Sequence, residues 1–508
     1  MNKTDFFRGD KPDETLRRLG YLDQYQYEHY DGKSAFLLTF IFKMKMPVDI
    51  KSLQEAAQTA IRVHPQFRQH VVMKSDGLWC SYPYRSVPVF DDSNVVIQTT
   101  IGSEQTGGYG FRIGYAGCRI TISVFHGVSD FHGVNLFCRT ILYYYLRSLG
   151  IDLQPGHNIV TLETPWNPQE AEDSAGLADS PENDLPGTRE NNSALMLLPA
   201  RSLPDPHFTR HIIQIPKNEY LHFAKTHDGT PVVAFFPFIS LALMEMFGSE
   251  SPITAVCPVN IRPYLNTVTM HNCSTSVVLR YIAKEINMPM DTQMTITHGM
   301  LILGTEPSRL IHRLKRRQLL QTQALEAGIP FTDYHEKNIS ENMNTFSNKQ
   351  ILFINNLGVL TLPENMRAYV ESVEFYSPQT VAHLQTIIYT LNDMVLQCFS
   401  KTMINTALLS VLISCFMSMV FIPILLKTPR SSAFSRLHGN KITMYDIMCS
   451  SNQTIIDHPG CYQLSLQDPY IFCSDIPAVN SAFLFHRLYD FTIYFSQKKD
   501  RHDQCSDL

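Results

Sequence analysis

His126 and Asp130 stand four residues apart in the run His126-Gly127-Val128-Ser129-Asp130, between a strand-like and a helix-like stretch. Side chains at such a junction commonly face a cleft. An imidazole has an unperturbed pKa of about 6.5, which suits it to act as a general base, and the carboxylate could orient the loop or the ring. The glycines at 127 and 133 would allow close approach of a substrate and a tight turn. Because this spacing also occurs in ordinary surface turns, the pair alone is a weak signal.

The hydrophobic pattern predicts the elements that position this pair. Residues 119–125 alternate between apolar and polar faces, as in a half-buried strand, and residues 133–149 have helical spacing. Upstream, the pattern predicts strands at 35–45, 67–73 and 95–100 and a helix at 53–63 that Pro65 ends. We therefore expect residues 1–150 to form one unit of mixed α/β type.

The rest of the chain divides into a linker, a second α/β unit and a tail. Residues 151–206 form the expected linker; within it, residues 169–190 hold seven acidic residues and one arginine, a composition that predicts a solvated segment. In the second unit, residues 207–428, the pattern predicts strands at 211–215, 253–257, 275–281, 350–360, 368–375, 383–390 and 394–400, and helices at 217–225, 231–247 and 310–327. The similar order of elements in the two units is typical of two related lobes. Residues 429–508 contain no motif and remain an unassigned extension.

The segment from Arg119 to Leu149 resembles the active-site segment of the His-x-x-x-Asp acyltransferase superfamily, which includes chloramphenicol acetyltransferase, peptide-synthetase condensation domains and alcohol acetyltransferases. Its pattern is His-His-x-x-x-Asp-Gly between a strand and a helix. Phe125 replaces the first histidine, and Phe131 stands where glycine is usual. Gly133 matches the second glycine of the alcohol-acetyltransferase version of the pattern, His-x-x-x-Asp-Gly-x-Gly.

Further matches occur in the family's order along residues 48–427. They are Arg62, Pro65, Phe67 and Arg68 after the first helix; Arg262 in the run 258–263; Asn272 in the run 270–274; Asn356 in the run 355–358, which resembles the Asn-Leu-Gly strand that precedes the cross-over into the other lobe; and the apolar stretch 406–427, which matches the last helix and strand. The 270–274 run departs from the family's Gly-Asn-Phe-Ser element, with His271 for glycine and Cys273 for phenylalanine.

The resemblance implies a fold and a reaction. The fold would be α/β, with two chloramphenicol-acetyltransferase-like lobes, each a mixed sheet with helices, and an active-site tunnel between them. His126 would be the general base that helps an alcohol or amine attack the thioester of an acyl-CoA or acyl-pantetheine carrier. Asp130 would pair with Arg262 to support the loop, and the acyl group would be acetyl. The reaction needs no acyl-enzyme, no metal and no permanently bound cofactor, and the sequence identifies no oxyanion donor.

Composition sets the broad class. The 508 residues are 44% hydrophobic and 18% charged, with a net charge of −5, so a globular protein is expected and no overall field favours nucleic acid. Eleven cysteines without a Cys-x-x-Cys pair indicate a reducing compartment, and residues 1–10 show no apolar signal-peptide core. These features predict a cytoplasmic protein.

Four alternatives remain open at this stage. His126, Asp130 and His132 could bind a metal, since imidazole and carboxylate are common ligands. The chain could be an inactive binding or scaffold protein that kept the fold, as Phe131 and His271 suggest. Residues 407–426 form an apolar run long enough to span a membrane. The basic run 312–317 could hold the phosphates of CoA, although such runs are usually solvated helix faces.

Overall fold

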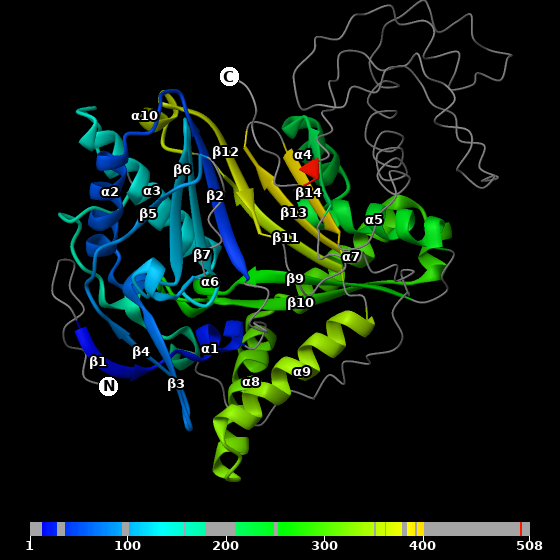
Figure 1. The fold of residues 1–508 in the computed structure, drawn as a ribbon. Helices are drawn as coiled ribbons and strands as arrows, with labels where there is room; N and C mark the ends of the chain where they lie inside the picture. Colours follow the sequence, from blue (N-terminus) through cyan, green and yellow to red (C-terminus); the bar gives the residue numbers. More distant parts are fainter. Residues whose placement is uncertain are drawn as a thin grey trace, which may run out of the picture.

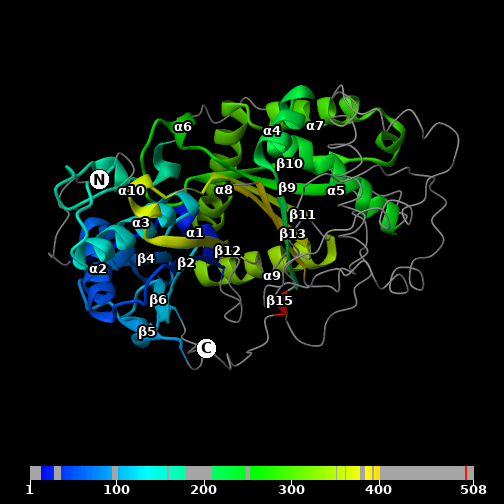
Figure 2. The same cartoon turned by 90° about the horizontal axis from the view of Figure 1, so that it is seen from above.

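The protein has two lobes, each built on a mixed β-sheet (Figures 1 and 2). The structure, a computed structural model, describes residues 13–27, 36–93, 101–156, 159–177, 209–247, 252–349, 352–360, 362–377, 384–391, 394–400 and 498–499. Sheets with helices in both lobes confirm the predicted α/β class.

The first lobe is a five-stranded sheet in the order β12-β2-β7-β6-β5. Its strands are β2 (Leu37–Met44), β5 (Val89–Asp91), β6 (Phe111–Ala116), β7 (Arg119–Phe125) and β12 (Val370–Tyr376), and its helices are α2 (Ile50–Val63) and α3 (Phe131–Ser148). The side chain of Asp49 caps α2 by accepting from Ser52 N at 2.7 Å. Phe67, in the 3₁₀ turn Pro65–Arg68 that follows α2, stacks on Phe137 of α3 at 3.9 Å between ring centroids. The cap fixes where α2 begins and the ring stacking joins the turn after α2 to α3, and buried side chains of both helices share one apolar core with the strands of this sheet.

The second lobe is a seven-stranded sheet in the order β10-β9-β11-β13-β14-β8-β15. Its strands are β8 (Thr209–Ile215), β9 (Ile253–Asn260), β10 (Ser274–Tyr281), β11 (Leu352–Val359), β13 (Leu384–Thr390), β14 (Met394–Ser400) and β15 (Lys498–Lys499), and its helices include α4 (Lys217–Thr226), α5 (Pro231–Phe247), α7 (Met290–Gly304) and α8 (Pro307–Glu326). Helix α5 is apolar almost all round because it is enclosed, with Val233, Ala234, Phe235 and Phe236 all at 0% exposure. It forms the centre of this lobe's core.

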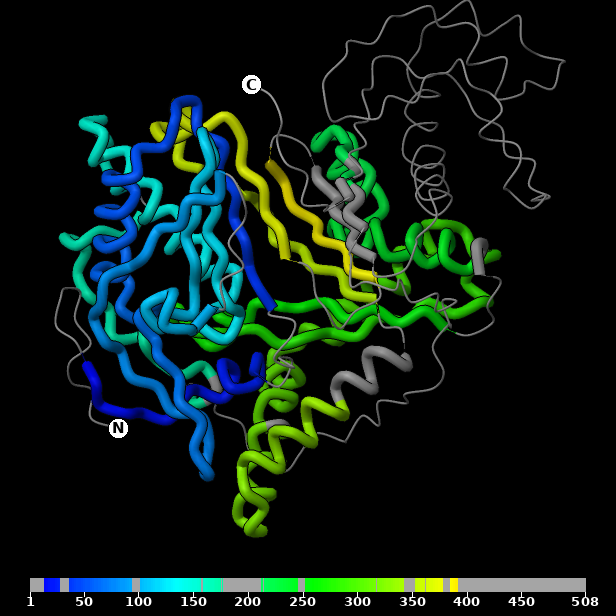
Figure 3. Tube along the Cα trace, in the orientation of Figure 1, coloured from blue at the N-terminus to red at the C-terminus, as the bar shows by residue number. Residues whose placement is uncertain are grey.

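One strand crosses between the lobes. After β11 the chain passes through the short helix α10 (Glu364–Arg367) into β12, which pairs antiparallel with β2 in the first-lobe sheet. It then returns to the second-lobe sheet as β13, which pairs in parallel with β11. Figure 3 follows this path in yellow beside the blue strand β2. The crossing that the resemblance implied after the Asn-Leu-Gly strand is therefore present, and it ties the two lobes together.

A small third sheet lies where the N-terminal segment meets the long helices. Its strands are β1 (Asp13–Arg18), β3 (His70–Lys74) and β4 (Gly77–Tyr82), in the order β1-β4-β3. Helix α1 (Tyr21–Tyr27) follows β1, and Phe331 at the start of α9 (Phe331–Lys349) joins the small core that includes Leu78, Cys80 and Tyr82. The sequence pattern predicted neither β1, β4 nor α1.

The acidic linker differs in part from its prediction. Residues 168–177 form two short 3₁₀ helices, η3 (Pro168–Ala171) and η4 (Ser174–Leu177), and Ser174 is fully buried. The prediction of a solvated segment was wrong at Ser174, because its hydroxyl donates to the Asn272 carbonyl of the second lobe. The carbonyls of Glu170 and Glu172 also accept hydrogen bonds from that lobe, while residues 169–173 stay partly exposed. The predicted strand at 95–100, the apolar run 407–426 and most of the extension 429–508 lie outside the described residues; β15 of the extension pairs with β8.

Within the described ranges, no single helix is long and apolar enough to cross a membrane. One pair, Lys217–Thr226 with Pro231–Met244, passes by length and composition but is bent by 87°.

Candidate active site

Asp130 joins the catalytic candidate to helix α3. As the N-cap residue it accepts hydrogen bonds from the main-chain nitrogens of His132 (3.1 Å) and Gly133 (3.4 Å). A carboxylate is a favoured cap because it satisfies free helix N–H groups and complements the positive end of the helix dipole. The cap sets the direction in which the chain leaves the loop 126–130 and enters α3.

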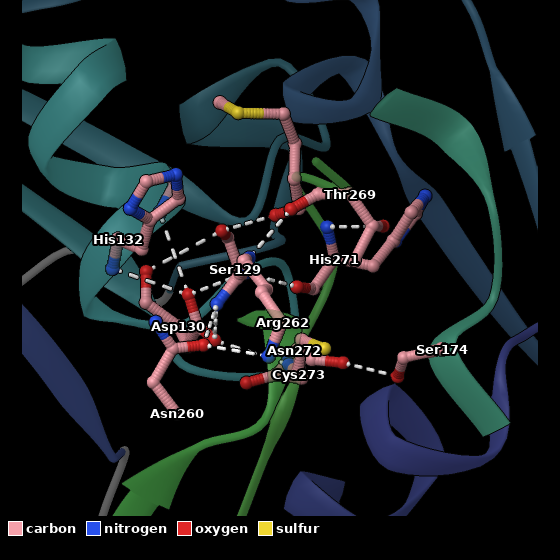
Figure 4. A network of polar contacts seen from close by, with 12 residues as sticks. Ser129, Asp130, His132, Ser174, Asn260, Arg262, Thr269, His271, Asn272 and Cys273 are labelled. Atoms are coloured by element: carbon pink, nitrogen blue, oxygen red, sulfur yellow. Dashed lines mark hydrogen bonds and ion pairs between the residues drawn. The ribbon is translucent and has the colours of Figure 1, made fainter. Parts of the chain in front are cut away.

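Arg262, the first residue of α6 (Arg262–Leu265), reaches the same carboxylate from the other lobe (Figure 4). Its Nη1 donates to Asp130 Oδ2 at 2.7 Å and its Nη2 to Asp130 Oδ1 at 2.9 Å. The remaining guanidinium hydrogens bond to Asn260 Oδ1 (3.2 Å), the Thr269 carbonyl (2.8 Å) and the His271 carbonyl (2.7 Å). A guanidinium has five N–H donors, and all five have partners here. The ion pair that the resemblance implied is present and fully hydrogen-bonded.

The electrostatics of this pair follow from its burial and its partners. Burial by itself raises the pKa of Asp130, but the charge of Arg262, its hydrogen bonds and the main-chain N–H of Cys273 at 3.0 Å outweigh burial and lower the pKa. For Arg262, burial lowers the pKa, and Asp130 more than reverses that effect, so its pKa is raised. Both groups are therefore charged, and the carboxylate is occupied by donors from α3, Arg262 and residue 273.

A second connection between the lobes crosses Gly133. Ser129 Oγ donates to the Met270 carbonyl at 2.5 Å. A Cβ added at Gly133 would lie 2.1 Å from Ser129 Oγ and 2.7 Å from the Met270 oxygen. Glycine is required here because the two loops approach each other directly over its α-carbon, in addition to the tight turn that the sequence suggested.

Asn272 holds the main chain of His126. Its Nδ2 donates to the His126 carbonyl at 2.7 Å and to Asp23 Oδ1 at 2.7 Å, and its main-chain N donates to Asp23 Oδ1 at 3.0 Å. Ser174 Oγ of the linker donates to the Asn272 carbonyl at 2.8 Å. The predicted residue Asn272 thus lies beside the predicted histidine. It is hydrogen-bonded to Asp23, to His126 and to Ser174, which come from three other parts of the chain.

Asp23 and His271 form a buried pair at the edge of this network. His271 Nδ1 lies 2.7 Å from Asp23 Oδ2, and the two residues are 8% and 1% exposed. Burial lowers the pKa of His271, but the carboxylates of Asp23 and Asp173 outweigh it, so the pKa is raised. Sequence reasoning missed Asp23, since α1 is a seven-residue helix without an apolar repeat; the signal it did notice was the histidine in place of a glycine at 271.

The ring of His126 packs against an aromatic ring, and the residue is partly exposed to solvent. It stacks on Phe36 with centroids 4.6 Å apart and planes 6° apart, and its main-chain N donates to the Phe36 carbonyl at 2.8 Å. The residue is partly exposed, while its Nδ1 is buried and has no hydrogen-bond partner among the residues that the structure describes. Burial lowers the pKa of His126, against the raising effects of Asp130 and Asn272. A neutral imidazole is the form that can accept a proton.

Two aromatic side chains, those of Phe125 and Tyr27, pack closely against Gly127. A Cβ there would lie 2.4 Å from Phe125 Cε1 and 2.6 Å from Tyr27 Cε2. The two rings pack edge to face with centroids 4.8 Å apart. Glycine at 127 therefore lets α1 and the end of β7 close over the main chain next to His126.

Other predicted residues have different positions. Phe131, the first residue of α3, packs its ring on Phe40 of β2 (5.8 Å) and on Phe375 of the crossing strand (5.1 Å). Asn356 is exposed on β11 and accepts from Gly358 N at 3.1 Å, where Gly358 has φ +70°; it takes no part in the network around Asp130. Arg313 of the basic run donates to the Ser276 carbonyl at 2.7 Å, so it has a structural use.

The structure does not favour the metal alternative. Both oxygens of Asp130 accept hydrogen bonds, and His132 contributes its main-chain N–H to that carboxylate. In the described part of the chain, no group of three or more His, Cys, Asp and Glu side chains could hold a metal ion.

Comparisons with known proteins give the fold its context. No protein-family model and no curated protein sequence matches the chain. Among solved structures, the condensation domain of the monacolin K polyketide synthase MokA matches with a TM-score of 0.55, at 13% identity over 81% of this chain and 99% of that chain. The starter condensation domain of the rhizomide synthetase RzmA, in complex with C8-CoA and Leu-SNAC, matches with a TM-score of 0.54, at 14% identity over 80% and 94%. TRI101 of F. sporotrichioides, in complex with coenzyme A and T-2, matches with a TM-score of 0.51, at 12% identity over 79% and 97%. The chain has the two-lobed fold of condensation domains and acyltransferases, as expected from the sequence.

Proposed function

We propose that this protein is an acyltransferase that moves an acyl group, in the first instance acetyl, from a CoA or carrier thioester to an alcohol or amine, with His126 as the general base. One observation carries the proposal: a histidine with a lowered pKa is held at the junction of the two lobes by a loop that both lobes fix. Three of the anchors, Asp130, Arg262 and Asn272, are the residues that the family resemblance selected. The similarity of the fold to a condensation domain and to TRI101 supports the proposal separately, because it does not depend on these three residues.

The chemistry requires only one proton carrier. Because Nδ1 of His126 is buried, we assign the proton transfer to Nε2. Nε2 takes the proton of the acceptor hydroxyl or amine while its oxygen or nitrogen attacks the thioester carbonyl carbon. The tetrahedral intermediate then collapses, the carbon–sulfur bond breaks, and the leaving thiolate takes the proton from the imidazolium. In this scheme the acceptor and donor would meet at His126 from opposite ends of a tunnel between the lobes.

The cysteine whose main-chain N–H bonds to Asp130 is not needed as a nucleophile. Cys273 is fully buried, and burial raises the pKa of its thiol to about 12, so it is protonated at physiological pH. Direct attack of the acceptor on the thioester is thus the simpler route. Cys80, Cys118, Cys138, Cys257 and Cys273 are free thiols, and we propose on this basis that the protein works in the reducing cytoplasm.

The ligands of two structural relatives support a thioester donor. The structures named above include complexes with coenzyme A and with C8-CoA. We therefore propose acyl-CoA as the donor to test first and a carrier-bound pantetheine thioester as the second. No permanently bound cofactor enters the scheme.

The test is release of free CoA from acetyl-CoA, measured with a thiol reagent against a panel of alcohols and amines. We expect acceptor-dependent release that falls by about 10²–10⁴-fold in His126→Ala, the range typical of removing a general base. His222→Ala, at an exposed position of α4 away from the network around His126, is the control and should release CoA at the wild-type rate. Release that His126→Ala does not change would refute the assignment of the base. Absence of release with CoA and carrier donors, together with tight acyl-CoA binding, would instead support the inactive binding protein.

A further inference from the structure

Asp23 is the one carboxylate of helix α1 that lies inside the site network. It is 1% exposed, and both of its oxygens are used within the network: Oδ1 accepts from the main-chain N and the Nδ2 of Asn272, and Oδ2 faces His271 Nδ1. It lies 249 positions before Asn272 in the sequence. A carboxylate that is buried this completely is costly unless it is paired and hydrogen-bonded, so the site depends on this arrangement being intact.

The contacts continue from Asp23 to His126 through one side chain. An amide Nδ2 carries two hydrogens. One hydrogen of Asn272 Nδ2 goes to Asp23 Oδ1 and the other to the His126 carbonyl, both at 2.7 Å. Asp23 therefore fixes the rotation of the Asn272 amide, and the amide fixes the main chain that carries the imidazole. Asn272 Oδ1 is buried without a hydrogen-bond partner among the described residues, so Asp23 and His126 account for the polar contacts of this amide.

Helix α1 supports the same loop by packing. The ring of Tyr27, one turn after Asp23, lies against Gly127, where an added Cβ would come within 2.6 Å of it. The start of the helix is tied to the linker, since Tyr21 N donates to Asp173 Oδ2 at 3.4 Å and the neighbouring Ser174 bonds to Asn272. The end of α1 thus packs on the His126 segment, and its start is tied to the linker next to the serine that bonds to Asn272.

The charge of Asp23 is balanced within the site. The groups that face the Asp23–His271 pair are Asp173 from the linker, Arg262 from α6, Tyr27 from α1, and Cys80 and Tyr82 from β4. Burial raises the pKa of Cys80 to about 11 and raises the pKa of both tyrosines, so these three are neutral at physiological pH. The raised pKa of His271 favours its protonated form, which would place a positive charge in direct contact with Asp23.

We infer that Asp23 is a positioning residue for His126: through the Asn272 amide it holds the loop that presents the base, and the contact with His271 Nδ1 holds its second oxygen in place. This inference rests on the proposed function, in which His126 is the base, and it gives the N-terminal segment a part in the site. Asp23 touches neither reactant in this assignment, so it acts only through Asn272.

A chemical probe of His126 tests the coupling without a substrate. Diethyl pyrocarbonate modifies neutral imidazole, and mass spectrometry of the full-length protein's peptides gives the rate at His126. At pH 8, where a histidine of lowered pKa is neutral, the rate reports how freely the loop moves and not its protonation. We expect Asp23→Ala to raise the rate on the order of tenfold, as is typical for groups in one hydrogen-bonded network. Asp23→Asn keeps an acceptor for Asn272 and should stay within about twofold of the wild type.

A double variant separates positioning from general loosening. Asn272→Ala should raise the rate at His126 as Asp23→Ala does, and the double variant should exceed neither single variant, because both changes cut one path. Asp92→Ala is the matched control: it removes a buried carboxylate, whose Oδ2 accepts from Arg112 Nη1 at 2.9 Å next to strand β5, without touching the site. It should destabilise the fold while leaving the His126 rate unchanged. The inference would be overturned if the increase in the modification rate of His126 in the double variant were the product of the two single increases. It would also be overturned if Asp92→Ala raised that rate as much as Asp23→Ala does.

The kinetic readout uses the acyl-transfer assay. Asp23→Ala should lower kcat on the order of tenfold with little change in the KM for the donor, and Asp23→Asn should restore most of it, because a displaced base affects the transition state more than donor binding. A change in KM alone would refute the positioning role. If no acyl transfer is found with any donor while the modification rates behave as expected, the proposed function fails and the coupling of Asp23 to the His126 loop stands.

Discussion

Asp130 and Arg262, 132 positions apart in the sequence, are joined by two parallel hydrogen bonds of 2.7 and 2.9 Å between the two lobes. Both side chains are nearly inaccessible, at 9% and 6% exposure. Removing one partner of such a pair leaves the other charge buried and uncompensated, which costs about 3–5 kcal/mol. The pair is therefore expected to fix the relative position of the lobes at the loop that carries His126.

The first prediction follows from this pair. Arg262→Ala should lower the free energy of unfolding by about 3–5 kcal/mol and reduce acyl transfer, measured by urea unfolding and by CoA release. Arg262→Lys should recover only part of both, since lysine cannot donate two parallel bonds. Arg112→Ala, which breaks the buried pair with Asp92, should cost stability without the specific loss of activity. Equal activity loss at matched stability in both variants would contradict a role for Arg262 in the site.

Local patterns in the sequence predicted the elements that are regular and half-buried. The alternation of Ile120, Ile122 and Val124 predicted β7, and the helical stripe that includes Val134, Phe137 and Ile141 predicted α3. The family resemblance added the partners in the second lobe and the crossing strand. Each of these signals is a repeat or a fixed order of motifs along the chain, so it can be recognised in one sequence without knowledge of the contacts between distant segments.

The parts that the sequence did not predict depend on contacts between distant segments. Asp23 is an ordinary polar residue of a short helix until His271 and Asn272 approach it from the other lobe. Ser174 gives no signal within an acidic segment, and its buried hydroxyl finds its partner, the Asn272 carbonyl, almost a hundred positions further along the chain. Tertiary contacts outweigh local composition at these positions, so no periodicity or propensity could have selected them.

A second prediction concerns the pH dependence of acyl transfer. Burial lowers the pKa of His126, so the base stays neutral to a lower pH than a free histidine would. The acid limb of kcat/KM should therefore have its midpoint below about 6.5, the ordinary histidine value. A profile of kcat/KM for the acceptor from pH 5 to pH 8, measured at a saturating concentration of the donor, gives this midpoint. A midpoint above 6.5 would show that a different group, or a protonated His126, limits the reaction.

The third prediction concerns the pH dependence of stability through His271. Its folded-state pKa is raised, so its pairing with Asp23 stabilises the protein fully below the unfolded pKa of about 6.5 and less as the pH rises through the folded value. His271→Gln should cost about 2 kcal/mol at pH 6, the scale of a hydrogen bond to a charged group, and less at pH 9. Chemical unfolding of both proteins at the two pH values gives the difference. A cost that grows toward pH 9 would mean that His271 is neutral in the folded protein.

The fourth prediction compares two helical glycines. Gly133→Ala places a Cβ 2.7 Å from the Met270 carbonyl and even closer to Ser129 Oγ, so the loops must separate, at about 1–3 kcal/mol. Gly299 of α7 has nothing within 4 Å of an added Cβ, and Gly299→Ala should stabilise the protein by up to about 1 kcal/mol because alanine favours helix. Thermal or urea unfolding of both variants tests the contrast. Similar behaviour of the two would mean that the Ser129–Met270 bond contributes little to holding the lobes.

The last prediction concerns Phe131, which stands where the family pattern has glycine. In this protein the ring packs with Phe40 and Phe375 between β2 and the crossing strand, and the residue has a helical conformation that needs no glycine. Phe131→Gly should therefore lower the free energy of unfolding by about 2–4 kcal/mol, through the lost ring contacts, and should not raise the rate of acyl transfer. Phe131→Leu, which keeps most of the volume, should cost about 1.5 kcal/mol or less. Unfolding and CoA release are measured on the same preparations. A gain in turnover in Phe131→Gly would show that the ring obstructs the path of a substrate. It would then favour the alternative that the natural protein is mainly a binding protein that kept the acyltransferase fold.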